Sequence, residues 1–254
     1  MISIGIDVGS VAAKAVAFDG QSVIAYDIMP TGWSPRDTGI ALFERLINKT
    51  QISKDNIKTI VGTGYGRISL PFIDHKITEI TCHGKGAHYL NPEIRTVIDI
   101  GGQDSKVIRL DEKGNIKEFL MNDKCAAGTG RFLQVMAHAL EIDISQLSDI
   151  ARGAEAQNIN SMCTVFAESE VISLMASGAS KESIAAGLLQ SVCKKTYSLV
   201  SRVGVEGKVF FSGGVSKNVL LGKLLSEKLE TEVISSELSQ FIGAIGASVI
   251  GYHR

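Results

Sequence analysis

The amino-acid sequence predicts an α/β fold in which one strand–turn–strand unit occurs twice. Residues 7–14 read DVGSVAAK and residues 99–106 read DIGGQDSK, so an Asp, a Gly and a Lys occupy equivalent places in both segments. An apolar run precedes or overlaps each segment, at residues 2–6 and 97–100. Such a repeat indicates two copies of one fold. The composition favours a packed chain, because 44% of the residues are hydrophobic and only four are prolines.

The first copy begins with short apolar runs that are typical of strands, and one helix interrupts them. Strands are expected at residues 2–6, 14–18, 23–29 and 57–62. A helix is predicted over residues 38–48, because Leu42, Leu46 and Ile47 recur at helical spacing.

The second copy restarts the strand pattern and then becomes mainly helical. Strands are expected at residues 96–100, 105–110, 116–121, 208–212 and 232–235, and helices at 130–141, 165–177, 184–203, 218–229 and 241–252. No linker separates the copies, so the boundary near residue 90 is interpreted as a hinge. We therefore predict an N-terminal half at residues 1–90 and a C-terminal half at residues 91–254.

The two glycine-containing turns have the chemistry of a phosphate site. Gly9 and Gly101 let backbone N–H groups approach an anion, Ser10 can donate a hydrogen bond, and Asp7 and Asp99 can hold Mg²⁺ through water. The alternative is an ordinary turn, for which Asp, Gly and Ser are common residues. Two copies between strands favour the phosphate site, although neither has the spacing of a Walker A loop or a dinucleotide fingerprint.

Two further glycine clusters are candidates for contact with a nucleoside. Gly213 and Gly214 follow an expected strand and precede a helix, so their backbone can lie flat against a ligand. Small residues also follow Gln240, at positions 243, 244, 246 and 247. Small residues at helical spacing equally permit two helices to pack closely, and both interpretations stay open.

Two of the four cysteines are candidate metal ligands. Cys125 and Cys163 each precede an expected helix, where backbone N–H groups and the helix dipole stabilise a thiolate. One chain would supply too few thiolates for a tetrahedral metal or a four-iron cluster, whereas a two-fold dimer would supply four. The alternative is a small buried hydrophobic residue. We favour that alternative for Cys82, in a stretch that reads as a loop, and for Cys193, in an apolar helix.

These motifs together resemble the activator component of 2-hydroxyacyl-CoA dehydratases, in an ATPase family that includes the ATP-binding subunits of benzoyl-CoA reductases. The matching segments follow the expected order over almost the whole chain: residues 7–14, 62–67, 99–106, 124–131, Cys163 with 167–171, 211–218 and 240–247. Such proteins resemble the actin, hexokinase and Hsp70 superfamily. The resemblance implies duplicated ribonuclease-H-like halves that close on ATP.

The resemblance also implies site residues. Asp7 and Asp99 would position Mg²⁺, and Gln103 or Asp104 would orient the attacking water. The residues expected at ATP or ADP are Gly9, Ser10, Val11, Lys14, Gly101, Gly102, Gln103, Gly213, Gly214 and Gln240, with Lys14 neutralising phosphate charge. Val11 stands where the family usually carries Thr, so a hydroxyl contact there would fall to Ser10.

The implied assembly is a homodimer with one [4Fe–4S] cluster bridged by Cys125 and Cys163 of each subunit. An electron would pass from a ferredoxin or flavodoxin through this cluster to a partner iron–sulfur enzyme, a dehydratase in the main interpretation. The alternatives are reduction of a related double-cubane cluster protein, a small-molecule kinase of the same superfamily, and a nucleotide-controlled scaffold without the cluster. An exposed cluster would be labile to oxygen, so anaerobic physiology is expected.

Charge and hydropathy argue against other classes of partner. The 26 basic and 27 acidic residues give a net charge of −1, which offers no electrostatic footprint for nucleic acid or an anionic membrane. No apolar run approaches the roughly 20 residues that span a bilayer, and no basic leader precedes the first expected strand. We therefore expect a cytoplasmic protein with reduced cysteines.

Overall fold

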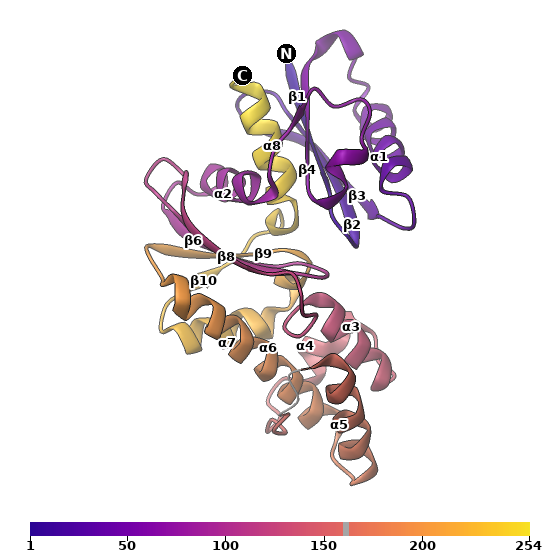
Figure 1. Ribbon diagram of the computed structural model, residues 1–254, viewed down its shortest axis with the longest axis vertical. Coiled ribbons are helices and arrows are strands. Elements are labelled where there is room, and N and C mark those ends of the chain that lie inside the picture. Colours follow the sequence, from indigo (N-terminus) through magenta and orange to yellow (C-terminus); the bar gives the residue numbers. More distant parts are fainter. Residues whose placement is uncertain (160–162) are drawn as a thin grey trace. The chain divides into compact units, whose positions relative to one another are not determined.

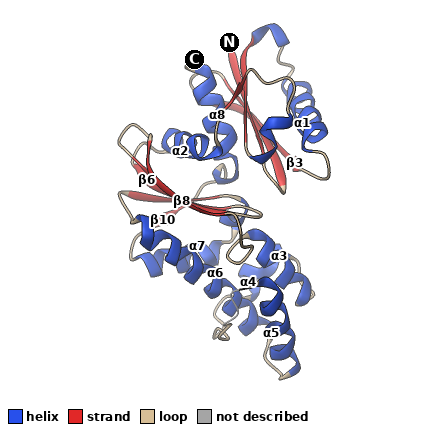
Figure 2. Cartoon of the chain, in the orientation of Figure 1, coloured by secondary structure: helices blue, strands red, loops and turns tan. Residues whose placement is uncertain are grey.

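The computed structural model describes residues 1–159 and 163–254, and these form an α/β protein with two sheets, as the sequence predicts (Figures 1 and 2). The chain makes two compact units, each assembled from separate segments. The first unit contains Met1–Val97, Ile108–Phe119 and Ser236–Arg254, and the second contains Ile98–Val107 and Leu120–Ser235. The predicted halves at residues 1–90 and 91–254 are defined by the repeated strand–turn–strand segment, not by compactness. That division stays a prediction.

The sheet of the first unit has the strand order β3-β2-β1-β4-β5. Its strands are β1 (Ile2–Val8), β2 (Ala12–Phe18), β3 (Val23–Pro30), β4 (Ile57–Thr63) and β5 (His75–Lys76). β1 pairs antiparallel with β2 and parallel with β4. Six consecutive residues of β1 are buried, because helices cover both faces of this sheet, and this explains its nearly continuous apolar sequence.

The helices of the first unit are α1 (Pro35–Thr50), α2 (Glu79–Leu90) and α8 (Ile242–Tyr252), with short 3-10 turns η1 (Lys54–Asn56), η2 (Tyr65–Ser69) and η5 (Ser239–Phe241). α1 packs on β2 and β3, whereas α8 packs on β1, β4 and α2; Figure 1 shows α1 and α8 on opposite sides of the strands. α1 begins earlier than predicted because the Ser34 hydroxyl caps it by accepting a hydrogen bond from the backbone N–H of Asp37.

The prediction of a loop around Cys82 is wrong, because this residue lies inside α2. Two glycines lower the helix propensity of the segment and hide the helix from sequence analysis. Packing against backbone requires a glycine at position 86, whereas Gly84 faces the ends of side chains. A Cβ on Gly86 would lie 2.0 Å from the Ile242 carbonyl oxygen in α8, and one on Gly84 would lie 2.7 Å from Ile116 Cδ1.

The second sheet has the strand order β10-β9-β6-β7-β8. Its strands are β6 (Ile94–Ile100), β7 (Ser105–Leu110), β8 (Ile116–Asn122), β9 (Lys208–Ser212) and β10 (Val233–Ile234). β6, β7 and β8 each contribute residues to both compact units. β10 pairs parallel with β9 through two residues, so it is shorter than predicted.

The remaining helices belong to the second unit. They are α3 (Gly130–Ala139), α4 (Leu147–Ile150), α5 (Thr164–Ala176), α6 (Lys181–Val203) and α7 (Val219–Leu229), with 3-10 turns η3 (Ile144–Gln146) and η4 (Gly214–Lys217). α6 is the central helix, since it contacts α4, α5 and α7, and α3 contacts α5. Their buried residues, among them Phe132, Met136, Leu188 and Leu225, form one apolar core.

Candidate functional site

The first phosphate-type turn joins β1 to β2. The backbone N–H of Gly9 donates a hydrogen bond to the Ala12 carbonyl at 3.2 Å. Asp7 faces Lys14 across the hairpin, with 3.6 Å between the carboxylate and the ammonium nitrogen. Asp7 is only 4% exposed, whereas Ser10 and Val11 are exposed at the tip of the turn. The turn therefore presents one hydroxyl and one apolar side chain at its tip, above a buried carboxylate.

The second turn repeats this geometry between β6 and β7. The N–H of Gly101 donates to the Asp104 carbonyl at 2.9 Å, and Lys106 Nζ lies 3.1 Å from Asp99 Oδ2. Lys106 is more buried than its counterpart, and it also pairs with Asp104 at 2.6 Å. Gln103 is exposed. The Asp104 carboxylate is thus engaged by Lys106, while Gln103 faces solvent.

A glycine with the same backbone conformation follows the neighbouring strand at each turn, β4 beside β1 and β9 beside β6. Gly64 has φ 80° and ψ 178°, and Gly213 has φ 85° and ψ 177°. A Cβ on Gly64 would lie 2.3 Å from an Asp7 carboxylate oxygen, and one on Gly213 would lie 2.2 Å from the Ile100 carbonyl. Positive φ and close approach to another strand both require glycine here. The duplication therefore extends beyond the two turns to the segments after β4 and β9.

The Asp99 carboxylate is held in place by hydrogen bonding as well as by charge. The Ser212 hydroxyl, immediately before Gly213, donates to Asp99 Oδ1 at 2.7 Å. Asp99 and Lys106 are 2% and 3% exposed. A buried carboxylate of this kind is stable only with such partners, so its orientation is fixed before any ligand arrives.

A histidine that sequence analysis did not single out lies beside the first turn. A Cβ on Gly243 would lie 2.7 Å from Asp7 Oδ2 and 2.9 Å from His83 Cε1. His83 is 8% exposed on α2, and Gly243 lies on α8. The small residues after Gln240 therefore permit the close packing of two helices and also leave space around Asp7. Sequence analysis missed His83 because it missed α2.

Gln240 lies in η5 of the first unit. Its Oε1 atom is buried and accepts no hydrogen bond from the residues that the structure describes. An unsatisfied buried acceptor calls for a further donor. A nucleotide can supply one, so this observation fits the predicted contact between Gln240 and ATP.

The second turn is hydrogen-bonded to the helix that follows Cys125. The N–H groups of Gly130 and Arg131, which open α3, donate to the carbonyls of Gly101 and Gly102 at 2.9 and 2.8 Å. The approach is close at Gly130, where a Cβ would lie 3.1 Å from the Gly101 carbonyl oxygen. These two hydrogen bonds attach the second turn directly to the first residues of α3.

The candidate ligand cysteines precede the two helices α3 and α5, which contact one another. Cys163 is exposed and is the N-cap residue of α5, although its thiol makes no capping hydrogen bond. Cys125 is half-buried, four residues before the N-cap Thr129 of α3, and its carbonyl accepts a hydrogen bond from Asn122. Both thiols are free.

The other two cysteines differ in burial and acidity. Burial raises the pKa of the Cys82 thiol to about 12 and that of Cys193 to about 11. These thiols lie within α2 and α6. Buried, protonated thiols behave as small apolar residues, which agrees with the interpretation favoured from the sequence.

The described parts of one chain hold no group of three or more His, Cys, Asp or Glu side chains arranged for a metal ion. Two cysteines from each of two chains would be needed for a four-thiolate site. Among the helices in residues 1–159 and 163–254, none has the length and apolar character to cross a membrane.

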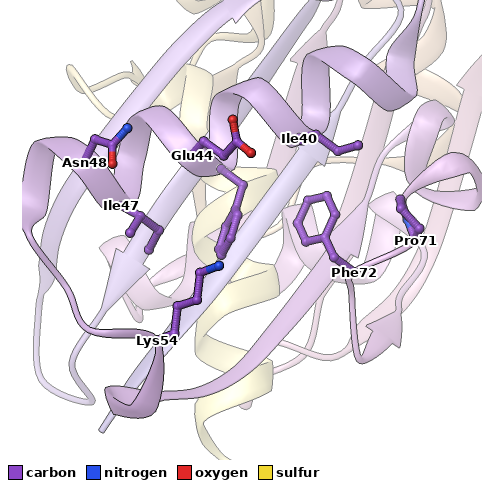
Figure 3. A pocket seen from close by; sticks show the side chains of 8 residues that line it. Ile40, Glu44, Ile47, Asn48, Lys54, Pro71 and Phe72 are labelled. Carbon is purple, nitrogen blue, oxygen red and sulfur yellow. The ribbon is translucent and has the colours of Figure 1, made fainter.

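A cavity of about 510 Å³ lies beside α1 (Figure 3). It is lined by Ile40, Phe43, Glu44, Ile47, Asn48, Lys54, Pro71 and Phe72. None of these residues belongs to the turns, the glycine clusters or the cysteine segments.

The structure thus groups the predicted residues by unit. Asp7, Gly9, Ser10, Val11, Lys14 and Gln240 belong to the first unit, and Asp99, Gly101, Gly102, Gln103, Asp104, Cys125, Cys163, Gly213 and Gly214 belong to the second. Their roles at a nucleotide or a metal stay predictions.

Comparison with known proteins places the chain in a defined group. The model of the BadF/BadG/BcrA/BcrD ATPase family matches residues 4–251. The activator of lactoyl-CoA dehydratase from Anaerotignum propionicum is 44% identical over 254 residues, covering 99% of this chain and 98% of the relative.

Comparison with solved structures finds proteins of the same kind. The activator of the 2-hydroxyisocaproyl-CoA dehydratase from Clostridium difficile, with bound ADPNP, has a TM-score of 0.94 and 42% identity, covering 100% of this chain and 95% of its own. The (R)-2-hydroxyglutaryl-CoA dehydratase component A from Acidaminococcus fermentans has a TM-score of 0.96 and 40% identity, covering 100% and 98%. Likeness in fold alone extends to the ROK hexokinase from Thermus thermophilus, at 15% identity and a TM-score of 0.58. The predicted hexokinase-type fold is confirmed.

Proposed function

Because this chain belongs to the BadF/BadG/BcrA/BcrD ATPase family, we propose that it is an ATP-hydrolysing iron–sulfur protein that activates a 2-hydroxyacyl-CoA dehydratase. The relatives at 44% and 42% identity are activators of such dehydratases. The observation that carries the proposal is the hydrogen bonding of the Gly101–Gly102 turn to α3, the helix that follows Cys125. This contact joins a phosphate-type turn to a candidate cluster ligand.

ATP with Mg²⁺ suits the donors that each turn offers. Asp7 and Asp99 are buried, oriented carboxylates, which are the ligands that Mg²⁺ takes together with water. Backbone groups at Gly9, Gly101 and Gly102 would hold phosphate oxygens. Lys14 would neutralise phosphate charge, since it is less buried than Lys106. Gly213 and Gly214 would lie near the nucleoside.

Gln103 is the better candidate for orienting the attacking water. Asp104 pairs with Lys106 at 2.6 Å, so its carboxylate is already committed, whereas the Gln103 side chain is exposed. A Gln amide can both donate and accept a hydrogen bond, which suits it to hold a water molecule. Substituting Gln103 should therefore slow hydrolysis more than it weakens nucleotide binding.

The hydrogen bonds at Gly130 and Arg131 would couple ATP hydrolysis to electron transfer. A change at the second turn on ATP hydrolysis would shift the start of α3 and the Cys125 segment with it. α5, which carries Cys163 at its N-cap, packs on α3 and would respond to the same movement. The resulting change in the surroundings of the thiols is the proposed link between hydrolysis and electron transfer.

The exposed thiol and its surroundings support a cluster shared between two chains. Cys163 is exposed beside Val165 and Phe166, which are 67% and 68% exposed. Ile172, two turns further along α5, is 55% exposed. An apolar surface next to a free thiol suits a homodimer in which each chain gives Cys125 and Cys163. A [4Fe–4S] cluster held by these four thiolates would carry one electron at low potential.

The remaining partners follow from this chemistry. A ferredoxin or flavodoxin would supply the electron, and an iron–sulfur dehydratase or a related double-cubane reductase would receive it. A reaction that uses ATP and CoA esters belongs in the cytoplasm. The duplicated halves are proposed at residues 1–90 and 91–254. The kinase and scaffold alternatives are not favoured, because the relatives of more than 40% identity with assigned roles serve dehydratases.

The first experiment measures iron and acid-labile sulfide in anaerobically purified protein and in its Cys125→Ala variant. We expect about four irons per dimer in the wild type and their loss in the variant. Cys193→Ala is the matched control, because this thiol is buried in α6, and it should keep its iron. Absence of iron after reconstitution, in a dimer that still hydrolyses ATP, would contradict the electron-transfer function.

A further inference from the structure

We propose that Thr31 is a positioning residue for the nucleotide: it holds the backbone of the first phosphate-type turn in the orientation that receives a phosphate group. Thr31 comes directly after β3 and lies outside both turns. This inference rests on the proposed function, since it concerns the nucleotide site of that ATPase. It adds a residue that binds the turn rather than the ligand.

Thr31 makes two hydrogen bonds to the first turn. Its hydroxyl donates to the Gly9 carbonyl oxygen at 2.7 Å, and its backbone N–H donates to the Val11 carbonyl oxygen at 2.9 Å. Thr31 is only 2% exposed, so water competes little for these bonds. One buried residue thus fixes the carbonyl groups of both neighbours of Ser10, which is exposed at the tip of the turn.

The orientation of the Gly9 carbonyl decides where the next N–H group points. In a planar trans peptide the C=O and N–H groups point in opposite directions, so holding the Gly9 carbonyl directs the Ser10 N–H away from the Thr31 hydroxyl. The Gly9 N–H is already used within the turn, because it donates to the Ala12 carbonyl. Val11 has no hydroxyl to offer a phosphate, so the contact depends on Ser10 and on the backbone that Thr31 orients.

Thr31 is itself held by the first helix. The Thr38 hydroxyl, in the first turn of α1, donates to the Thr31 carbonyl oxygen at 2.6 Å, and α1 packs on β2 and β3. The second phosphate-type turn is anchored differently, because its carbonyls at Gly101 and Gly102 accept hydrogen bonds from the start of α3. The first turn is thus fixed to the sheet of its own unit and sets nucleotide affinity, whereas the second is attached to the helix that follows Cys125.

Three threonine substitutions separate positioning of the turn from stability of the fold. Thr31→Val removes the hydroxyl but keeps the side-chain shape and the backbone N–H, whereas Thr31→Ser keeps the hydroxyl. Thr50→Val is the matched control, because the Thr50 hydroxyl also donates to a backbone carbonyl in the first unit, that of Leu46 at 2.8 Å. Isothermal titration calorimetry measures the affinity of each anaerobic holoprotein for ADP in the presence of Mg²⁺, and thermal unfolding measures the melting temperature.

We expect Thr31→Val to weaken ADP binding by about tenfold, and Thr31→Ser and Thr50→Val to stay within about threefold of the wild type. The two valine variants should have similarly lowered melting temperatures, since each loses one hydroxyl–carbonyl hydrogen bond.

Unchanged ADP affinity in Thr31→Val would overturn the inference. An equal loss of affinity in Thr50→Val would also overturn it, because affinity would then follow stability, and so would a Thr31→Ser variant as weak as Thr31→Val. Wild-type protein that folds but binds no ADP would instead overturn the proposed function.

Discussion

At the residue scale, the two turns differ in how their charges are balanced. Lys14 and Lys106 occupy equivalent places, yet Lys106 contacts both Asp99 and Asp104, at 3.1 and 2.6 Å, whereas Lys14 lies 3.6 Å from Asp7. The repeat in the sequence predicts the equivalence but not this difference. Burial causes it, because a lysine that is 3% exposed must keep its counter-charges close.

Replacing the buried lysine should therefore destabilise the protein. Lys106→Met leaves Asp99 and Asp104 without their shared ammonium, so we expect the free energy of unfolding to fall by about 3 kcal/mol. Chemical denaturation of the iron-free protein measures this change. Lys223→Met, at an exposed position of α7, should change stability by less than about 0.5 kcal/mol. Equal stability of the two variants would refute the role of the buried pair.

The burial of the thiols predicts their reactivity. With thiol pKa values raised to about 12 and 11, Cys82 and Cys193 hold almost no thiolate at pH 8. Iodoacetamide should therefore modify two thiols per chain in the native iron-free protein, Cys125 and Cys163, and all four after unfolding. Both native sites should be protected once the cluster is reconstituted. Peptide mapping by mass spectrometry identifies the modified thiols. Modification of Cys82 before Cys125 and Cys163 would contradict the prediction.

At the element scale, α5 has an outer face that is unusual for a surface helix. Its exposed residues carry no charge: they are Val165, Phe166, Ser169, Ile172, Ser173 and Ala176. A helix exposed to water normally places charged residues on this face. The apolar pattern predicts this helix correctly. Because apolar residues occur on all sides of it, the pattern does not tell which face the rest of the protein covers.

A charge on this face should separate the two chains of the proposed dimer. We expect Phe166→Asp to sediment as a monomer and to lose its iron, since burying an unpaired carboxylate in an interface is costly. Val219→Asp is the matched control, because Val219 is 60% exposed on α7 of the same unit. Analytical ultracentrifugation under anaerobic conditions measures both. A Phe166→Asp protein that remained a dimer would place the interface elsewhere.

At the scale of the whole molecule, the sequence predicts most elements and the repeated turns, because both depend on local patterns. It does not predict α2, since Gly84 and Gly86 are chosen for contacts with distant residues rather than for helix propensity. His83 was missed for the same reason. The equivalence of Gly64 and Gly213 also emerges only in three dimensions, where both follow strands that neighbour those carrying Asp7 and Asp99.

The placement of α8 has a consequence for how the chain is made. β1 is synthesised long before α8, yet a Cβ on its Gly5 would lie only 1.9 Å from the Ala244 carbonyl oxygen in α8. The first unit is thus complete only when residues 236–254 have been synthesised, whereas the second unit ends at Ser235. The unit that contains β1 therefore cannot finish folding before residues 98–235 have been synthesised, and its apolar sheet face needs protection until then.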